Sequence, residues 1–575
     1  MAEPAERSAP SDDRPACATA TPGRLVLALA ATALLLGPVV VAIWAVPYFV
    51  TQDGPAHLYN AWILARSFSP GSPFEPYFAV RWQPVPNWSG HLLLATLMKV
   101  ASPWVADRAV LTLTLLGFAM ALVALRWVVR GDRGLLGAGL VAAVLAPNMP
   151  WLAGFTSFLL GSIFFAVTLA AWWPGRDRPG AGRIALVGVL LALGYFCHLV
   201  SLGLTVLALG YLALFAPPEV DGPRPWRRRA RRLATTALCG LPLLALVPAY
   251  LHLSRQGGPM QPAWENMGDP FALSGWLIRI KWADPLSLAV RDMIPFGEAQ
   301  RPMYLAFAPV IWLLAAAIAW VSGGLPSAIR GRPAGGQPAV VAPGAGGVWT
   351  SLAAVLMLAS LLSPDSMGEG HGAYLPQRVM LLGLAALVPG LDFRMGRSFG
   401  LAAAACVLAA LALQSAIVWD YALHSQRTAG RVAAARDLVG DGRRIATLLA
   451  DIRSRFRCNP LLHADGWLGV GNGNIVWSNY EAQFYYFPVQ FRPGLDHPAP
   501  REFELVALGT DPEATPEAAA RWESILAGHN AVIDEVVVWG RDPALDAITG
   551  RWFEPVRERG NVRVFAKKGA GAGGR

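Results

Sequence analysis

Long runs of apolar residues without a charge dominate the first three quarters of this chain. The first run extends from Leu25 to Val46, 22 residues without an Asp, Glu, Lys or Arg. About 20 apolar residues in a helix cross the ~30 Å hydrocarbon core of a bilayer. The apolar core of a cleaved signal peptide is shorter, so we expect this run to be a retained membrane span.

Ten further apolar stretches follow, which makes eleven expected spans. They lie at 105–129, 134–148, 153–173, 184–198, 200–216, 233–252, 302–322, 349–363, 379–391 and 399–419. Only 15% of the 575 residues are charged, against about 25% in soluble proteins, which excludes an ordinary soluble enzyme. The 22 tryptophans exclude a disordered protein. Five scattered cysteines do not form a disulfide framework or a thiolate metal site.

The distribution of charge predicts the orientation of these spans. The tail, 420–575, holds 19 basic and 19 acidic residues, so the net charge of +10 arises in residues 1–419. With the N-terminus in the cytoplasm, inner segments carry 18 Lys/Arg and outer segments carry 9. Cytoplasmic loops of membrane proteins are enriched in Lys and Arg. The basic excess therefore indicates a cytoplasmic N-terminus and an outer tail, and it gives no reason to expect nucleic-acid binding.

The chain therefore reads as a polytopic α-helical membrane protein with a C-terminal soluble α/β domain. We expect a disordered cytoplasmic segment at 1–23, a transmembrane domain at 24–419 and an extracytoplasmic domain at 420–575. Three outer loops are expected, at 49–103, 253–301 and 364–378. A high content of Ala, Gly and Arg is typical of GC-rich bacterial genomes, which suggests the bacterial inner membrane as the location.

The tail alternates helical and strand-like patterns. Helical spacing is expected over 433–456 and from Pro516 to Ala527, where Thr515 is a good N-cap and Pro516 suits the first helical position. Runs rich in Val, Ile, Phe and Tyr predict strands at 474–477, 484–491, 502–508, 531–539 and 561–566.

The first outer loop opens with a short polar motif, Asp53-Gly54-Pro55-Ala56-His57. Asp53 follows the first span directly, and an acid at the membrane boundary is a functional candidate. Asp53 would act as a general base or a metal ligand, with His57 beside it. The alternative is that Asp53 only caps the helix that begins at Gly54.

Two arginines of the outer loops are candidates for binding phosphate. Arg81 lies near Trp82 and Trp88, a pattern that suits a phosphate or a sugar ring, although tryptophans also form interfacial belts. Arg378 is a fixed charge at the start of a span, where it could hold a phosphate bidentately. Its alternative role is ordinary snorkelling at a helix end.

The third outer loop contains Asp365, Glu369 and His371. Glu369 and His371 are candidate ligands of a divalent cation, Mg²⁺ or Mn²⁺. The spacing lacks the helical register of a zinc motif, so a flexible polar loop is the alternative. His198 is expected to be a structural residue, and His463 and Asp465 of the tail are expected at the surface.

The order of these features resembles the GT-C superfamily of polytopic glycosyltransferases. The resemblance depends on the first span, the acid of the Asp53-Gly54-Pro55-Ala56-His57 motif just beyond it, and the later outer loop that ends in Arg378. It implies an inverting-type enzyme that takes a sugar from a polyprenyl-phosphate donor on the outer face of the membrane. By this resemblance Asp53 is the catalytic acid, and Arg378, with Arg81, stabilises the leaving phosphate.

Two other functions are compatible with the sequence. A transporter or flippase for a lipid-linked glycan would carry charges at the membrane midplane and broken helices in repeated halves. A membrane anchor for glycan assembly, without transferase activity, would need no acid at the boundary. The transferase interpretation requires Asp53, His57, Arg81, Glu369 and Arg378 to meet at one outer cavity.

Overall fold

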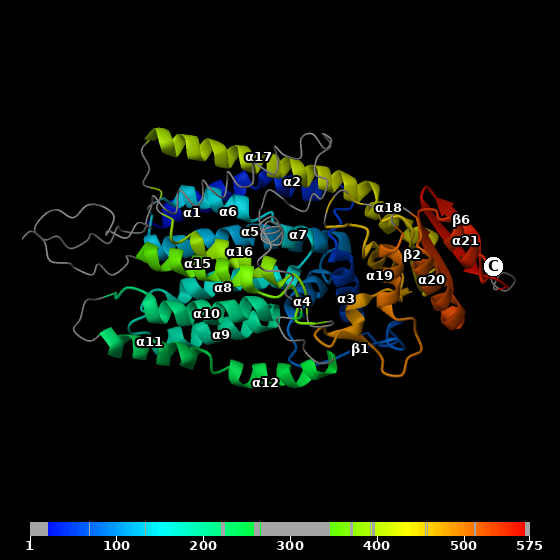
Figure 1. The fold of residues 1–575 in the computed structure, drawn as a ribbon, viewed down its shortest axis with the longest axis horizontal. Helices are drawn as coiled ribbons and strands as arrows, with labels where there is room; N and C mark the ends of the chain where they lie inside the picture. The colour runs from blue at the N-terminus through cyan, green and yellow to red at the C-terminus, as the bar shows by residue number, and fades with distance from the viewer. Residues whose placement is uncertain are drawn as a thin grey trace, which may run out of the picture.

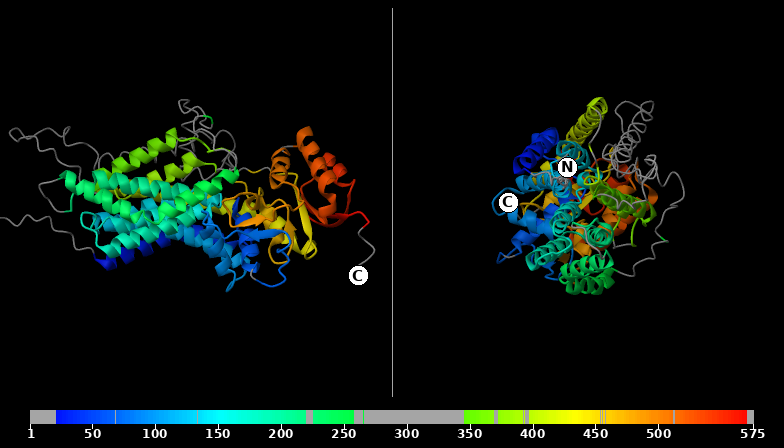
Figure 2. Two further views of the ribbon diagram at one scale, coloured as in Figure 1. Left: turned by 90° about the horizontal axis from the view of Figure 1, so that it is seen from below. Right: turned by 90° about the vertical axis from the view of Figure 1, so that its left-hand side faces the viewer.

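The computed structural model describes residues 21–67, 69–132, 134–219, 225–257, 265, 345–368, 372–391, 393, 397–452, 454, 456, 458–510 and 513–569. A long helical bundle forms one end of the molecule and an α/β unit forms the other (Figure 1). Figure 2 shows the same division after a quarter turn. The helices of the bundle are α1 (Pro22–Leu35), α2 (Gly37–Ala45), α5 (Pro103–Arg130), α6 (Leu135–Leu145), α7 (Met149–Leu152), α8 (Thr156–Trp172), α9 (Ala181–Cys197), α10 (Leu199–Phe215), α11 (Pro225–Cys239), α12 (Leu243–Ser254), α15 (Ala345–Leu362), α16 (Leu375–Leu387) and α17 (Arg397–Arg427).

The helical, membrane-type character expected from the apolar stretches is confirmed. Within the described residues, α5 and the helical run Gly400–Leu438 are each long and apolar enough to cross a membrane. The α1–α2 pair and the α11–α12 pair pass the same test together but are bent by 46° and 59°, so each is a broken span or a re-entrant loop. The described residues also contain six shorter apolar helices of 10–17 residues. The count of eleven spans and the orientation stay predictions, and stretch 302–322 lies outside the described residues.

The bends in the two broken pairs have a local cause. Each expected span, 25–46 and 233–252, contains a Gly and a Pro close together at the break, Gly37-Pro38 in the first and Gly240 with Pro242 in the second. Proline lacks the backbone N–H that continues a helix, and its ring clashes with the preceding turn. The proline positions therefore account for the bends, and the second pair begins at Pro225, before the start of the expected span.

The tail contains a mixed sheet with flanking helices. Its five strands run in the order β3 (Ile475–Val476), β2 (Arg444–Leu449), β5 (Glu535–Trp539), β7 (Val562–Lys567) and β6 (Phe553–Arg559). Strands β3, β2 and β5 are parallel, and β5, β7 and β6 are antiparallel. The helices are α18 (Ala429–Ala434), α19 (Pro500–Leu508), α20 (Pro516–His529) and α21 (Pro543–Thr549). Thr515 caps α20 as expected, because its hydroxyl accepts the Ala518 N–H.

Several expectations for the tail are wrong. The helical spacing expected over 433–456, with an interruption at Gly440-Asp441-Gly442, corresponds to the end of α18, a short 3₁₀ helix and then β2, whose residues after Arg444 are all buried without alternation. The strand expected at 502–508 is helix α19, which buries Phe503, Val506 and Ala507 at helical spacing. Of the strand expected at 484–491, only β4 (Val489–Phe491) forms. Strand β6 was not expected, because most of its residues are exposed and polar.

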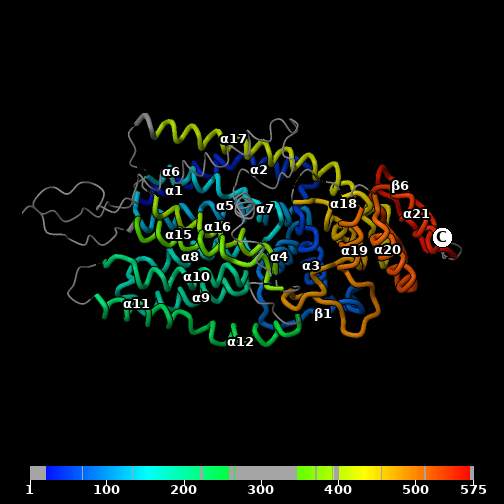
Figure 3. Tube along the Cα trace, in the orientation of Figure 1, coloured from blue at the N-terminus to red at the C-terminus, as the bar shows by residue number. Residues whose placement is uncertain are grey.

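Segment 49–103 and the tail share one hydrophobic core. Helix α3 (Gly54–Arg66) packs on the 3₁₀ helix η7 (Ala464–Gly469), and α4 (Trp88–Leu97) lies beside α3 (Figure 3). The short strand β1 (Phe78–Val80) pairs antiparallel with β4, which joins the two segments by backbone hydrogen bonds. The Tyr59 hydroxyl of α3 also donates to the Asn474 carbonyl at 2.8 Å. This shared core fixes Asp53 and His57 against residues of the tail.

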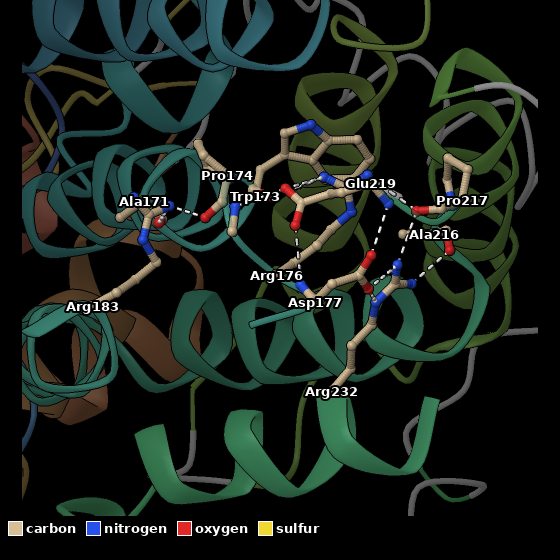
Figure 4. Close-up of polar contacts among 11 residues, drawn as sticks. Ala171, Trp173, Pro174, Arg176, Asp177, Arg183, Ala216, Pro217, Glu219 and Arg232 are labelled. Atoms are coloured by element: carbon tan, nitrogen blue, oxygen red, sulfur yellow. Dashed lines mark hydrogen bonds and ion pairs between the residues drawn. The ribbon is translucent and has the colours of Figure 1, made fainter. Parts of the chain in front are cut away.

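A buried ion-pair cluster ties helices together at the bundle end remote from the tail (Figure 4). Arg232 of α11 is 1% exposed and donates to Asp177 at 2.5 Å and to the Ala216 carbonyl at 2.6 Å. Asp177 also accepts the Glu219 N–H at 2.7 Å, and Glu219 forms an ion pair with Arg176 at 3.2 Å. The α8–α9 turn is therefore held to the connection between α10 and α11.

Removal of Asp177 is expected to destabilise this end of the bundle. Asp177→Ala leaves the Arg232 guanidinium buried without its anion, and breaking a buried ion pair in this way costs about 3–5 kcal/mol. The measurement is the free energy of unfolding in detergent micelles, followed by tryptophan fluorescence. Arg231→Ala, an exposed neighbour on the same helix, should change it by less than about 0.5 kcal/mol. Equal effects of the two variants would contradict a structural role for the cluster.

Candidate functional site

A cavity of about 380 Å³ lies where the helical bundle meets the tail. Its size is within the range of small-molecule binding pockets. The bundle contributes Phe155, Phe158, His198, Tyr374 and Arg378, segment 49–103 contributes Gln52, Asp53, His57 and Asn87, and the tail contributes His463, Tyr480, Phe484, Tyr486, Phe487 and Glu504. Aromatic rings form much of the wall, with a few charged groups among them. This combination suits a ligand that has both an apolar and a charged part.

Asp53 lies at the N-cap position of α3, but its side chain does not cap the helix. The carboxylate instead accepts the Gln52 side-chain N–H at 3.3 Å and a hydrogen bond from Tyr480. His463 of the tail lies 3.8 Å from the same carboxylate, measured from Nε2 to Oδ1. The Asp53 side chain is 14% exposed and borders the cavity. Its position thus leaves the carboxylate available to a ligand.

The pKa of Asp53 is displaced toward neutral. Burial raises this pKa to about 6, the His57 ring opposes the rise, and the Glu481 carboxylate adds to it. A carboxyl group with a pKa near the working pH is partly ionised and can exchange a proton efficiently. Asp53 therefore has the electrostatic setting of a general base.

The close approach of two backbone segments holds Asp53 in place. The Asp53 N–H donates to the Ala153 carbonyl at 3.0 Å. Gly154 follows with φ +81°, and a Cβ at this position would come within 2.8 Å of the Gly54 nitrogen and 3.2 Å of the Asp53 nitrogen. Only glycine combines this backbone angle with this approach. The turn before α8 therefore supports the backbone of the motif that contains Asp53.

His57 belongs to a buried cluster with Glu481 and His91. Its Nδ1 contacts Glu481, and Nε2 of His91 lies 2.9 Å from the same carboxylate. Glu481 also accepts the Asn60 side-chain N–H at 2.7 Å. Burial alone would raise the pKa of Glu481, but the two imidazoles lower it to about 2. Burial lowers the pKa of His57, yet the charge and hydrogen bond of Glu481 raise it above its ordinary value.

Arg378 enters the cavity wall from the N-terminal end of α16. Its guanidinium lies over the rings of Phe155 and Phe158, 4.6 and 5.6 Å from their centroids. Its Nη1 lies 2.8 Å from Nε2 of His198. Among the described residues, no carboxylate lies within ion-pair distance of Arg378, and its Nε is buried without a hydrogen-bond partner. The cavity therefore presents a cation whose anion is not supplied by the described protein.

The structure brings together three of the residues expected at the site. Asp53, His57 and Arg378 border the same cavity. Arg81 is not among the lining residues; its guanidinium donates to the Gln256 side chain at 3.0 Å. Glu369 and His371, the expected metal ligands, lie outside the described residues.

Other residues of the site were not assigned from the sequence. The surface positions expected for His463 and Asp465 are wrong, since both are buried: His463 borders the cavity, and Asp465 accepts the Thr447 hydroxyl at 2.6 Å. Burial lowers the pKa of His463 to about 3, so its ring is neutral. Tyr480 and Glu481 carry no local motif. Their proximity to Asp53 and His57 depends on how the tail folds onto α3.

Comparison with known proteins finds likeness in structure only. No family model matches the chain, and no curated protein matches its sequence. ArnT from Cupriavidus metallidurans bound to undecaprenyl phosphate is similar with TM-score 0.48 and 13% identity, covering 96% of this chain and 99% of that chain. The Archaeoglobus fulgidus oligosaccharyltransferase in the apo form is similar with TM-score 0.45 and 12% identity, covering 90% of this chain and 69% of that chain.

At 12–13% identity and TM-scores below 0.5, the likeness assigns no substrate and no residue role to this chain. The chemistry of the cavity therefore rests on the residues that line it.

Proposed function

We propose that this chain is a membrane glycosyltransferase that moves a sugar from a polyprenyl-phosphate donor to a lipid, glycan or protein acceptor on the outer face of the bacterial inner membrane. The observation that carries the proposal is that one cavity is lined by two groups of opposite charge. Asp53 presents a carboxylate with a raised pKa, and Arg378 presents a guanidinium without a carboxylate partner among the described residues. A carboxylate can take the proton of an acceptor hydroxyl, and a guanidinium can stabilise a leaving phosphate, the two tasks that sugar transfer from a phosphate sets.

The proposed reaction is a single displacement at the anomeric carbon. The acceptor hydroxyl forms a new C–O bond to this carbon while the bond from the carbon to the phosphate oxygen breaks. The hydroxyl proton passes to Asp53, and the electron pair of the broken bond stays on the polyprenyl phosphate. Arg378 stabilises that negative charge with its guanidinium donors. Displacement from the opposite face inverts the configuration of the anomeric carbon.

Two further features of the cavity support this assignment. The aromatic residues Tyr480, Phe484 and Tyr486 of the tail line the same pocket as the charged groups, and sugar rings stack on such side chains. Phe155 and Phe158 hold the Arg378 guanidinium against the bundle, which is the side from which a membrane-embedded donor would approach. Burial of the charges in a poorly solvated pocket strengthens their effect on the transition state.

A detergent assay separates transfer from transport, because micelles have no two sides. Polyprenyl-phosphate sugars would be extracted from the host membranes after growth on radiolabelled sugar, then incubated with the full-length protein and host envelope extract. A transferase releases free polyprenyl phosphate and moves the label into an acceptor fraction. A flippase leaves the donor intact. If the donor is unchanged with every acceptor fraction while the protein retains its melting transition, the proposal is wrong.

A further inference from the structure

The cluster of His57, His91 and Glu481 contains groups of the kind that bind transition metals. The three side chains come from α3, α4 and the 3₁₀ helix η8 (Tyr480–Gln483), and they are 8%, 1% and 0% exposed. One nitrogen of each imidazole and one oxygen of the carboxylate lie within 4.8 Å of one another. Chain segments that are distant in the sequence therefore converge with their ligand atoms toward one point.

A second set of hydrogen bonds orients these groups. Nδ1 of His91 lies 3.0 Å from the Asn87 carbonyl, which can only accept, so this nitrogen carries a proton and Nε2 is the one turned toward the cluster. The Asn60 side chain donates both to Glu481 and to the Ala56 carbonyl, at 2.7 and 3.1 Å. Metal-binding histidines are typically held in this way, with the second ring nitrogen donating to a carbonyl.

The Glu481 carboxylate is the centre of the cluster. Its Oε1 contacts Nδ1 of His57, and its Oε2 lies 2.9 Å from Nε2 of His91. Burying a carboxylate is costly unless neighbouring groups compensate its charge. The two imidazoles do so in the structure, and a cation held between the carboxylate and the two rings would do the same.

We propose that His57, His91 and Glu481 form a zinc-type metal site in the wall of the cavity. Two imidazoles and one carboxylate are the protein ligands of one common type of catalytic zinc site, in which the fourth position is left open. Imidazole-rich sites suit Zn²⁺ and related transition metals, whereas Mg²⁺ and Ca²⁺ prefer oxygen ligands. His57 also borders the cavity, so the site lies between the buried core of the tail and the ligand space.

This site differs from the one expected from the sequence. The sequence pointed to Glu369 and His371 of the third outer loop and to Mg²⁺ or Mn²⁺, whereas the proposed ligands come from segment 49–103 and the tail. The proposal does not depend on sugar transfer, since metal binding is measured directly. A failure of the glycosyltransferase assay would leave it untouched.

The test measures zinc binding to the full-length protein in detergent. The protein would be purified with a tag that contains no histidine, stripped with a chelator and equilibrated with ZnSO₄. We expect one zinc per chain by elemental analysis, and no saturable binding of Mg²⁺ at the same concentration. Glu481→Gln and His91→Gln each remove a ligand, so each should weaken zinc binding by at least the roughly 10–100-fold that loss of a group orienting a ligand costs.

His463→Gln is the matched control, since His463 is another buried imidazole at the same cavity but lies outside the cluster. It should change the zinc affinity by less than about threefold. X-ray absorption on the zinc-loaded wild-type protein provides a readout that needs no variant, and two imidazole neighbours without sulfur are expected. Sulfur neighbours, the absence of imidazoles, no stoichiometric zinc, or equal loss in His463→Gln would each overturn the proposal.

Discussion

Replacement of Asp53 by Asn is expected to lower the rate of sugar transfer by about 10²–10⁴-fold, the usual contribution of a positioned general base. Asn keeps the size of the side chain and can still accept from Gln52 and Tyr480, but it cannot take a proton. The measurement is kcat for release of polyprenyl phosphate in the detergent assay. The loss should fall on kcat more than on KM, because the proton moves only as the reaction proceeds.

Glu504→Gln is the matched control for Asp53. Glu504 is a second carboxyl group at the cavity, and burial raises its pKa as well. If only the negative potential of the cavity matters, both variants should lose activity to the same extent. If Asp53 accepts the proton, Glu504→Gln should retain activity within about tenfold of wild type, below the range expected for loss of a general base. An Asp53→Asn protein that is correctly inserted and still retains more than about a tenth of wild-type activity would remove the catalytic assignment.

Replacement of Arg378 by Gln is expected to reduce transfer by about 10²–10³-fold, because the developing charge on the leaving phosphate would lose its main electrostatic partner. The side chain is held by Phe155 and Phe158, so the guanidinium is preorganised. Arg378→Lys should recover only part of the activity, since an ammonium cannot make the two parallel hydrogen bonds of a guanidinium. Binding of the polyprenyl-phosphate donor, measured separately, should weaken in both variants.

Arg66→Gln is the control for the Arg378 experiment. Arg66 ends α3 and lies over the Trp62 ring, and it is not among the residues that line the cavity. Its removal subtracts the same charge from the protein but should leave transfer within about threefold of wild type, as expected for a surface site with little energetic coupling to the reaction. Equal losses for Arg66 and Arg378 would show that overall charge, and not a phosphate contact, controls activity.

The helical segments of the bundle could be located from the sequence because the signal is local. A run such as Leu25 to Val46 is mostly apolar and carries no charge at any position, and a segment in a bilayer must satisfy its backbone hydrogen bonds within itself. The acid at position 53 was likewise visible, since it follows the first run directly. Helix α20 was predictable for the same reason, because its cap and its first-turn proline are adjacent residues.

The tail was harder to predict, because its elements are decided by their neighbours. Strand β2 is buried after Arg444 without alternation, and it is a strand because β3 and β5 pair with its two edges. The composition of residues 502–508 suits a strand as well as a helix. Only the packing of Phe503 and Val506 at helical spacing shows that this segment is helix α19.

The sequence by itself determined that this chain places an acid directly after its first apolar segment and an arginine at the start of a later one. Only the tertiary structure decided that Asp53 and Arg378 face one cavity, and that His57 meets His91 and Glu481. The physical reason is that hydropathy and capping act between residues near one another in the chain. The site instead forms where α3 packs against a segment of the tail. At this contact Asn60 donates to Glu481, a residue 421 positions away in the chain.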